Sequence, residues 1–145
     1  MIVTIIVNDD FSVNLYKNDE LFLYMKRKSR WGKLIGKIYN TKDKLLIKVE
    51  SFLWLGTKIT YQNLDTAFSK IGCYLYDRFT LGKKDKIEFF YFLIYYRIYW
   101  NNKFIADTKV IYTLKHNLKL ELHFNIDDDE QIYYTCIFFC ITCLY

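Results

Sequence analysis

The nineteen residues from Asp127 to Tyr145 constrain the fold of this chain more than any other stretch. They read DDDEQIYYTCIFFCITCLY, an acidic cluster and a glutamine followed by fourteen residues without charge, glycine or proline. Carboxylates suit the free N–H groups and the positive end of a helix, and Asp128 with Gln131 has capping-box spacing. A helix that is apolar on every side must be enclosed on every side. This one is shorter than the roughly 20 residues that span a bilayer. It is therefore either the core of a domain or not a helix.

Residue propensity alone favours a strand, because β-branched and aromatic residues dominate the apolar run. That preference spans only about 1 kcal/mol per site. Burying about ten large side chains contributes at most roughly 15–30 kcal/mol, which outweighs it. We therefore predict a buried helix over about residues 128–145. If this helix is the core, deletion of residues 131–145 should abolish soluble folding.

Almost everything before this stretch predicts short antiparallel strands joined by turns. Residues 118–124 alternate strictly between apolar and polar side chains, as a half-buried strand does. Asn101-Asn102 is a two-residue hairpin signal. The run 87–100 is too long for one strand and should break near Tyr95, and 63–68 is either a loop or a helical turn. Further strands are expected at 2–7, 11–16, 21–25, 34–39, 45–49, 52–55, 58–61 and 72–79.

About twelve strands need something inside them. A closed sheet of about eight strands is filled by its own side chains. One of about twelve has a lumen, and an α-helix is about 10–12 Å across. Hydrophobic residues make up 52% of the 145 residues and aromatic residues 20%, which argues against disorder and for a large core. We therefore predict one domain over 1–145, a closed antiparallel barrel with strands over about 2–126 around the C-terminal helix.

The segment 96–109, YRIYWNNKFIADTK, and the ending 127–145 resemble the tubby-like β-barrel superfamily. That superfamily includes tubby C-terminal domains, phospholipid scramblases, LURP-one-related proteins and small bacterial relatives. In the bacterial relatives a similar hairpin precedes an acidic turn and a final hydrophobic helix. Asn102 stands where a turn glycine is usual, and asparagine tolerates the left-handed conformation. The resemblance implies a barrel around a helix and a binding module. The phosphoinositide contacts of tubby do not align with this chain, so none are carried over.

Residues 26–33, KRKSRWGK, form a basic segment with five cations and one tryptophan. Cations bind phosphate groups, and an indole settles at a membrane interface. Nucleic-acid backbone is a second anionic target, but the net charge of +5 is too small to require it, and we do not expect it. The alternative is a solvated hairpin connection whose charges guard a strand edge. Lipid binding should weaken with salt and with charge reversal of Arg27 and Arg30. The candidate anion- or lipid-binding residues are Lys26, Arg27, Lys28, Arg30, Trp31 and Lys33.

Other motifs have structural interpretations. Cys136, Cys140 and Cys143 have the C-x3-C-x2-C spacing of some iron–sulfur sites, but no α/β barrel follows them. In a helix they share one face, and we interpret them as small packing residues. The acids 127–130 lack the glycine and alternating ligands of an EF-hand. His116 and His123 are near no nucleophile. We expect no catalytic residue, metal or cofactor.

Two classes of function stay open. One is a peripheral binding module for phosphoinositide-like or other anionic lipids. The other is a protein-interaction or scaffold domain with no small ligand. An enzyme is the weakest alternative, since no nucleophile–base pair can be named. Met1 runs directly into an apolar strand with no basic leader or cleavage site, so we expect a cytoplasmic protein without a transmembrane segment, peripheral at membranes if it binds lipid.

Overall fold

The computed structural model describes residues 1–52, 56–112 and 118–142. Within these ranges the chain forms twelve strands followed by one helix. The elements are β1 Ile2–Val7, β2 Val13–Lys17, β3 Glu20–Arg30, β4 Lys33–Asn40, β5 Leu45–Phe52, β6 Gly56–Tyr61, β7 Phe68–Cys73, β8 Tyr76–Leu81, β9 Asp85–Phe92, β10 Tyr95–Trp100, β11 Lys103–Tyr112, β12 Leu118–Phe124 and α1 Asp129–Thr142.

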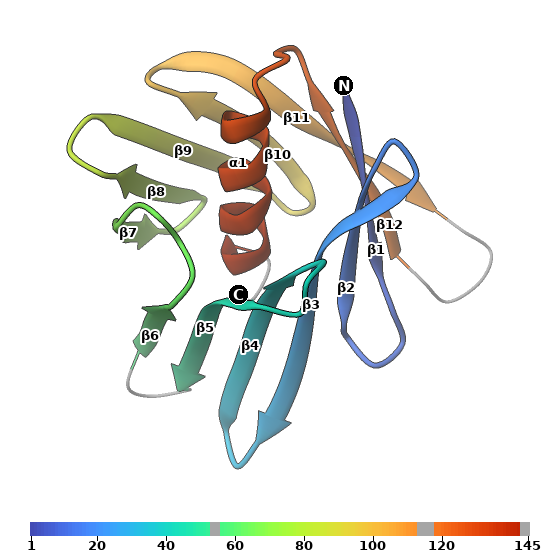
Figure 1. Cartoon of the computed structure of the whole chain (residues 1–145), viewed down its shortest axis with the longest axis vertical. Coiled ribbons are helices and arrows are strands. Elements are labelled where there is room, and N and C mark those ends of the chain that lie inside the picture. Colours follow the sequence, from blue (N-terminus) through green and yellow to red (C-terminus); the bar gives the residue numbers. More distant parts are fainter. Residues whose placement is uncertain (53–55, 113–117, 143–145) are drawn as a thin grey trace.

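All twelve strands belong to one antiparallel sheet that curls around α1 (Figure 1). The sheet consists of two meanders, β1 to β6 and β7 to β12. They are joined where β1 pairs with β12, with Ile5 opposite Leu120. The strand order starts at β6 and ends at β7, so the sheet is not closed. The predicted mainly β fold with about twelve antiparallel strands and a C-terminal helix is confirmed, and the predicted closed barrel is wrong.

The connection between β6 and β7 is hydrogen-bonded to each half of the sheet separately. The N–H group of Gln62 donates to the carbonyl of Leu46, on the β5 side. The N–H group of Gly82 donates to the carbonyl of Ala67, on the β8 side. We call the gap between β6 and β7 the seam.

Helix α1 begins as its acidic cluster predicts. The backbone N–H of Gln131 donates to Oδ1 of Asp128 at 2.9 Å, and the Gln131 side chain donates to Oδ2 at 3.3 Å. Lys17 forms an ion pair with Asp129 at the same end. From Ile132 to Thr142 every residue is buried except the half-buried Tyr133. Enclosure on all sides has therefore overridden the local β propensity.

The core consists of the helix and the inward side chains of the strands. The Phe138 ring stacks on Phe79 with centroids 4.4 Å apart and lies 5.1 Å from Phe68. Phe139 meets Tyr96 edge-on at 4.8 Å. Aromatic residues thus connect α1 to β7, β8 and β10.

Two predicted boundaries are wrong. Residues 72–79 are not one strand, because the chain turns at Tyr74 and Leu75, and Leu75 has a positive φ of 65°. The strand predicted at 21–25 is also longer than expected. β3 continues through the basic segment to Arg30, and the chain turns at Trp31 and Gly32, whose φ angles of 50° and 71° match the strand twist. The run 87–100 breaks at 93–94, as expected. Most of the strand predicted at 52–55 lies outside the described residues.

Candidate functional site

The side chains of the basic segment divide between the two faces of the sheet, because β3 alternates. Leu23 and Met25 are buried against the core, and Arg27 follows them at half-burial on the same inner side. Lys26 and Lys28 are exposed on the outer side. The structure therefore separates one predicted candidate from the others.

The ladder from β3 to β6 gathers further cations on the outer side. Lys37 lies opposite Lys26 in β4, and Lys48 lies opposite Lys37 in β5. Lys58 of β6 lies opposite Glu50. We call this surface the basic face. Its cations are Lys26, Lys28, Arg30, Lys33, Lys37, Lys48 and Lys58.

The strands of the basic face contribute one carboxylate, and a second one, Asp43 of the β4–β5 turn, accepts from the Tyr24 hydroxyl at 2.5 Å. Within the described residues of β3 from Lys26 onward and of β4 to β6, Glu50 is the acidic residue. It accepts from Lys33 at 2.8 Å and from Lys48 at 3.0 Å. The Lys33 hydrogen bond, followed by that of Lys48, lowers the pKa of Glu50 to about 2. The strands of this face thus carry seven cations and one carboxylate that stays ionised, which leaves a positive surface.

Aromatic rings stand among these cations. The rings of Tyr24 and Tyr39 stack at 5.1 Å, and the Lys26 ammonium lies 5.8 and 5.6 Å from their centroids. Trp31 is 94% exposed at the tip of the β3–β4 hairpin. Five of the six predicted candidates therefore lie on or at the end of one face, and Arg27 does not. Lys37, Lys48 and Lys58 were not among the candidates predicted from the sequence. They could have been found from their positions on the polar side of the predicted strands.

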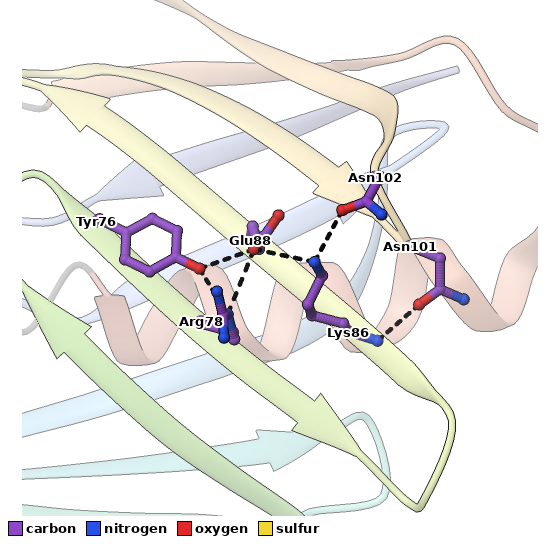
Figure 2. Close-up of polar contacts among 6 residues, drawn as sticks. All are labelled: Tyr76, Arg78, Lys86, Glu88, Asn101 and Asn102. Atoms are coloured by element: carbon purple, nitrogen blue, oxygen red, sulfur yellow. Dashed lines mark hydrogen bonds and ion pairs between the residues drawn. The ribbon is translucent and has the colours of Figure 1, made fainter.

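A second polar cluster lies on the outer side of β8 to β11 and is drawn in Figure 2. At its centre, Glu88 accepts from the Tyr76 hydroxyl at 2.8 Å and pairs with Arg78 and Lys86 at 3.3 Å each. Burial opposes ionisation of Glu88, yet the bonds from Tyr76 and Lys86 hold its pKa below the ordinary value. Asn102 accepts from the Lys86 ammonium at 2.8 Å. These groups satisfy one another, and we assign the cluster to holding the strands together.

Asn101 and Asn102 form the predicted hairpin turn. Their φ angles are 46° and 68°, the left-handed values that a two-residue turn requires. The Asn101 side chain accepts from the backbone N–H of Lys86 at 2.8 Å and donates to Asp85 at 2.9 Å. The turn thereby fastens the β10–β11 hairpin to β9.

The remaining candidates have structural surroundings. Cys136 and Cys140 are buried in α1, and burial raises the pKa of the Cys136 thiol. Nε2 of His123 lies 2.9 Å from Glu121. Cys143 and His116 lie outside the described residues. No group of three His, Cys, Asp or Glu side chains within the described ranges could hold a metal ion.

The seam contains a buried charge pair. Asp77, on the inner side of β8, is 3% exposed, and its Oδ2 lies 3.5 Å from the Lys70 ammonium. Gly72 of β7 lies opposite Asp77, and a Cβ atom at position 72 would overlap the Asp77 carboxylate. A cavity of about 390 Å³ adjoins this pair, lined from the other side by Thr57 and Ile59 of β6.

Among the described segments, no helix has the length and apolar character needed to span a bilayer. Comparison with known proteins found no matching family model, no matching curated protein and no matching solved structure.

Proposed function

We propose that this protein is a non-enzymatic binding module that attaches to anionic lipid surfaces through its basic face. The observation that supports the proposal is the gathering of seven cations around one carboxylate on a single sheet face. Trp31 at the hairpin tip adds an amphipathic ring of the kind found at membrane interfaces.

The physical basis is long-range attraction to anionic headgroups. Each Lys or Arg near an anionic leaflet contributes about 1 kcal/mol, and the contribution falls off within a Debye length. Because the cations stand on the outer side of adjacent paired strands, several can approach one surface together. The attraction should therefore be additive over several side chains and sensitive to salt.

Membership of the tubby-like superfamily stays a prediction. The described chain has twelve antiparallel strands with an apolar helix after them. The open seam departs from the closed barrel that the resemblance implies. The lipid-binding proposal therefore rests on the basic face of this chain and not on that relationship.

The test is cosedimentation with phosphatidylcholine vesicles, with and without about a third of phosphatidylserine or a few per cent of a phosphoinositide. We expect binding only to the anionic vesicles, with loss at high salt. Lys28→Glu with Arg30→Glu should remove it. Lys103→Glu with Lys109→Glu changes the net charge equally at two exposed positions away from the basic face and should retain it. Equal loss of vesicle binding in both double variants would show that the binding depends on net charge and not on the basic face. Binding that neither variant nor salt changes would refute the proposal.

A second candidate function is a protein-interaction domain with no small ligand. It is favoured by the apolar side chains that stay exposed at and beside the β9–β10 turn, with Phe92 64%, Leu93 74% and Tyr95 61% exposed. In that case Phe92→Ser with Tyr95→Ser should lose a stoichiometric protein partner that the Lys28→Glu, Arg30→Glu variant keeps. A pull-down with both variants distinguishes the two functions.

A further inference from the structure

An apolar cavity lies inside the curled sheet, apart from the basic face. Its volume is about 270 Å³. Ile5 of β1, Val13 of β2 and Leu120 of β12 line one side, and Phe139 of α1 lines another. All four side chains are at least 96% buried. The cavity therefore lies within the hydrophobic core, and the core side chains leave it unfilled.

The rim of this cavity is formed by exposed and half-buried apolar side chains. Leu93, at the β9–β10 turn, lines it and is 74% exposed. Val7, half-buried at the end of β1, also lines it. An apolar chain could thus pass from the rim to the buried wall without crossing a polar layer.

Arg27 is the charged side chain that lines the cavity within the described chain. Its Nε donates to the carbonyl oxygen of Phe11 at 2.5 Å, and its guanidinium lies 5.9 Å from the centroid of the Phe11 ring. These contacts hold the group in place without neutralising it. Arg27 forms no ion pair with any carboxylate of the described residues.

A half-buried cation without a counter-ion beside an apolar cavity matches a ligand that has an anionic group and a hydrocarbon chain. Removing charge from water is costly unless an opposite charge pairs with it. A guanidinium binds a carboxylate with two parallel hydrogen bonds, and its terminal nitrogens remain for this once Nε is used. The walls beyond it favour hydrocarbon, since each buried CH₂ group contributes about 0.8 kcal/mol.

We propose that this cavity binds a single-chain anionic amphiphile, a medium-chain fatty carboxylate, with its carboxylate on Arg27 and its chain against Phe139 and Leu120. The volume of about 270 Å³ falls just below the range of roughly 300–1,000 Å³ for small-molecule pockets, which suits one short chain and not a diacyl lipid. The site is independent of the proposed membrane attachment, because Arg27 faces inward and the basic face points outward.

The test is isothermal titration calorimetry of the full chain with decanoate below its micelle concentration. We expect saturable binding of one decanoate per protein. Arg27→Met keeps an apolar stem and should weaken it about ten- to a hundredfold, as expected for a charge-assisted bond. Arg30→Met, the matched change on the basic face, should leave it unaltered. Decanol should bind wild type and Arg27→Met equally.

Val7→Phe supplies a second measurement. The phenylalanine ring is larger than the valine side chain at the rim, so it should block entry of decanoate while Arg27 is kept. Circular dichroism establishes that each variant is folded. Absence of saturable decanoate binding to the wild type would overturn the proposal. So would a decanoate affinity equal to that of the wild type in the folded Arg27→Met and Val7→Phe variants. Tighter binding of decyl phosphate than of decanoate would overturn the carboxylate assignment.

Discussion

Replacing Phe138 by alanine tests whether α1 is the core of this fold. Phe138 is fully buried, and its ring stacks on Phe79 with centroids 4.4 Å apart. It also lies 5.1 Å from Phe68 and 6.1 Å from Tyr134. The side chain therefore joins the helix to the edge strand β7 and to β8, and its removal should weaken both attachments.

The expected cost follows from the lost contacts. Replacing a buried phenylalanine by alanine typically costs about 3–5 kcal/mol, including the cavity that remains. Whole domains are stable by only about 5–15 kcal/mol, so the variant should be close to the limit of folding. With a urea m-value of about 2 kcal/mol/M, a loss of 4 kcal/mol moves the midpoint of unfolding down by about 2 M.

The assay is urea unfolding followed by circular dichroism. Phe104→Ala is the matched control, because Phe104 lies in β11 and is 37% exposed, and its replacement should cost much less. Phe138→Leu keeps most of the volume and should fall between the two. The reasoning is refuted if Phe138→Ala costs less than about 1 kcal/mol, or no more than Phe104→Ala.

Three further predictions concern other parts of the fold. Gly72→Ala should destabilise by about 1–3 kcal/mol, because the new methyl group overlaps the Asp77 carboxylate, and a double-mutant cycle with Asp77→Ala should recover most of the loss. Glu50 has its pKa lowered to about 2 in the folded protein, against an ordinary value of 4.5, so its contribution is present above pH 4.5 and lost as the pH falls towards 2. Melting temperatures of Glu50→Gln should therefore fall less steeply over that range than those of the wild type, and equal slopes would contradict the ion-pair assignment. Deletion of residues 131–145 should leave no soluble folded monomer, and a folded, monomeric truncation in size-exclusion chromatography and circular dichroism would show that the helix is dispensable.

Local chemistry made part of the structure predictable. Asp128 and Gln131 lie three residues apart and cap α1 through direct contacts. Asn101 and Asn102 adopt the left-handed values that their turn needs. In both places the residues that determine the conformation are neighbours in sequence.

Features that depend on distant partners were not predictable in the same way. The open strand order, which starts at β6 and ends at β7, depends on pairings between distant strands that no local pattern shows. The turn at Tyr74 and Leu75 has none of the usual turn residues. The basic face could be predicted only with the cross-strand register, which places Lys48 opposite Lys37. Arg27 faces inward because β3 extends through the basic segment and its side chains alternate between the two faces of the sheet.

The position of α1 after all twelve strands has a consequence for synthesis on the ribosome. At about 5–20 residues per second, the 128 residues that precede Asp129 take roughly 6–26 s to make. During that time the inner faces of the strands have no helix to cover them, and β1 waits for β12, its partner at the joint between the two meanders. The nascent chain therefore displays apolar strands and unpaired edges until its last element emerges. We expect the newly made protein to depend on chaperones that hold β-rich chains, and to fold only after translation of α1.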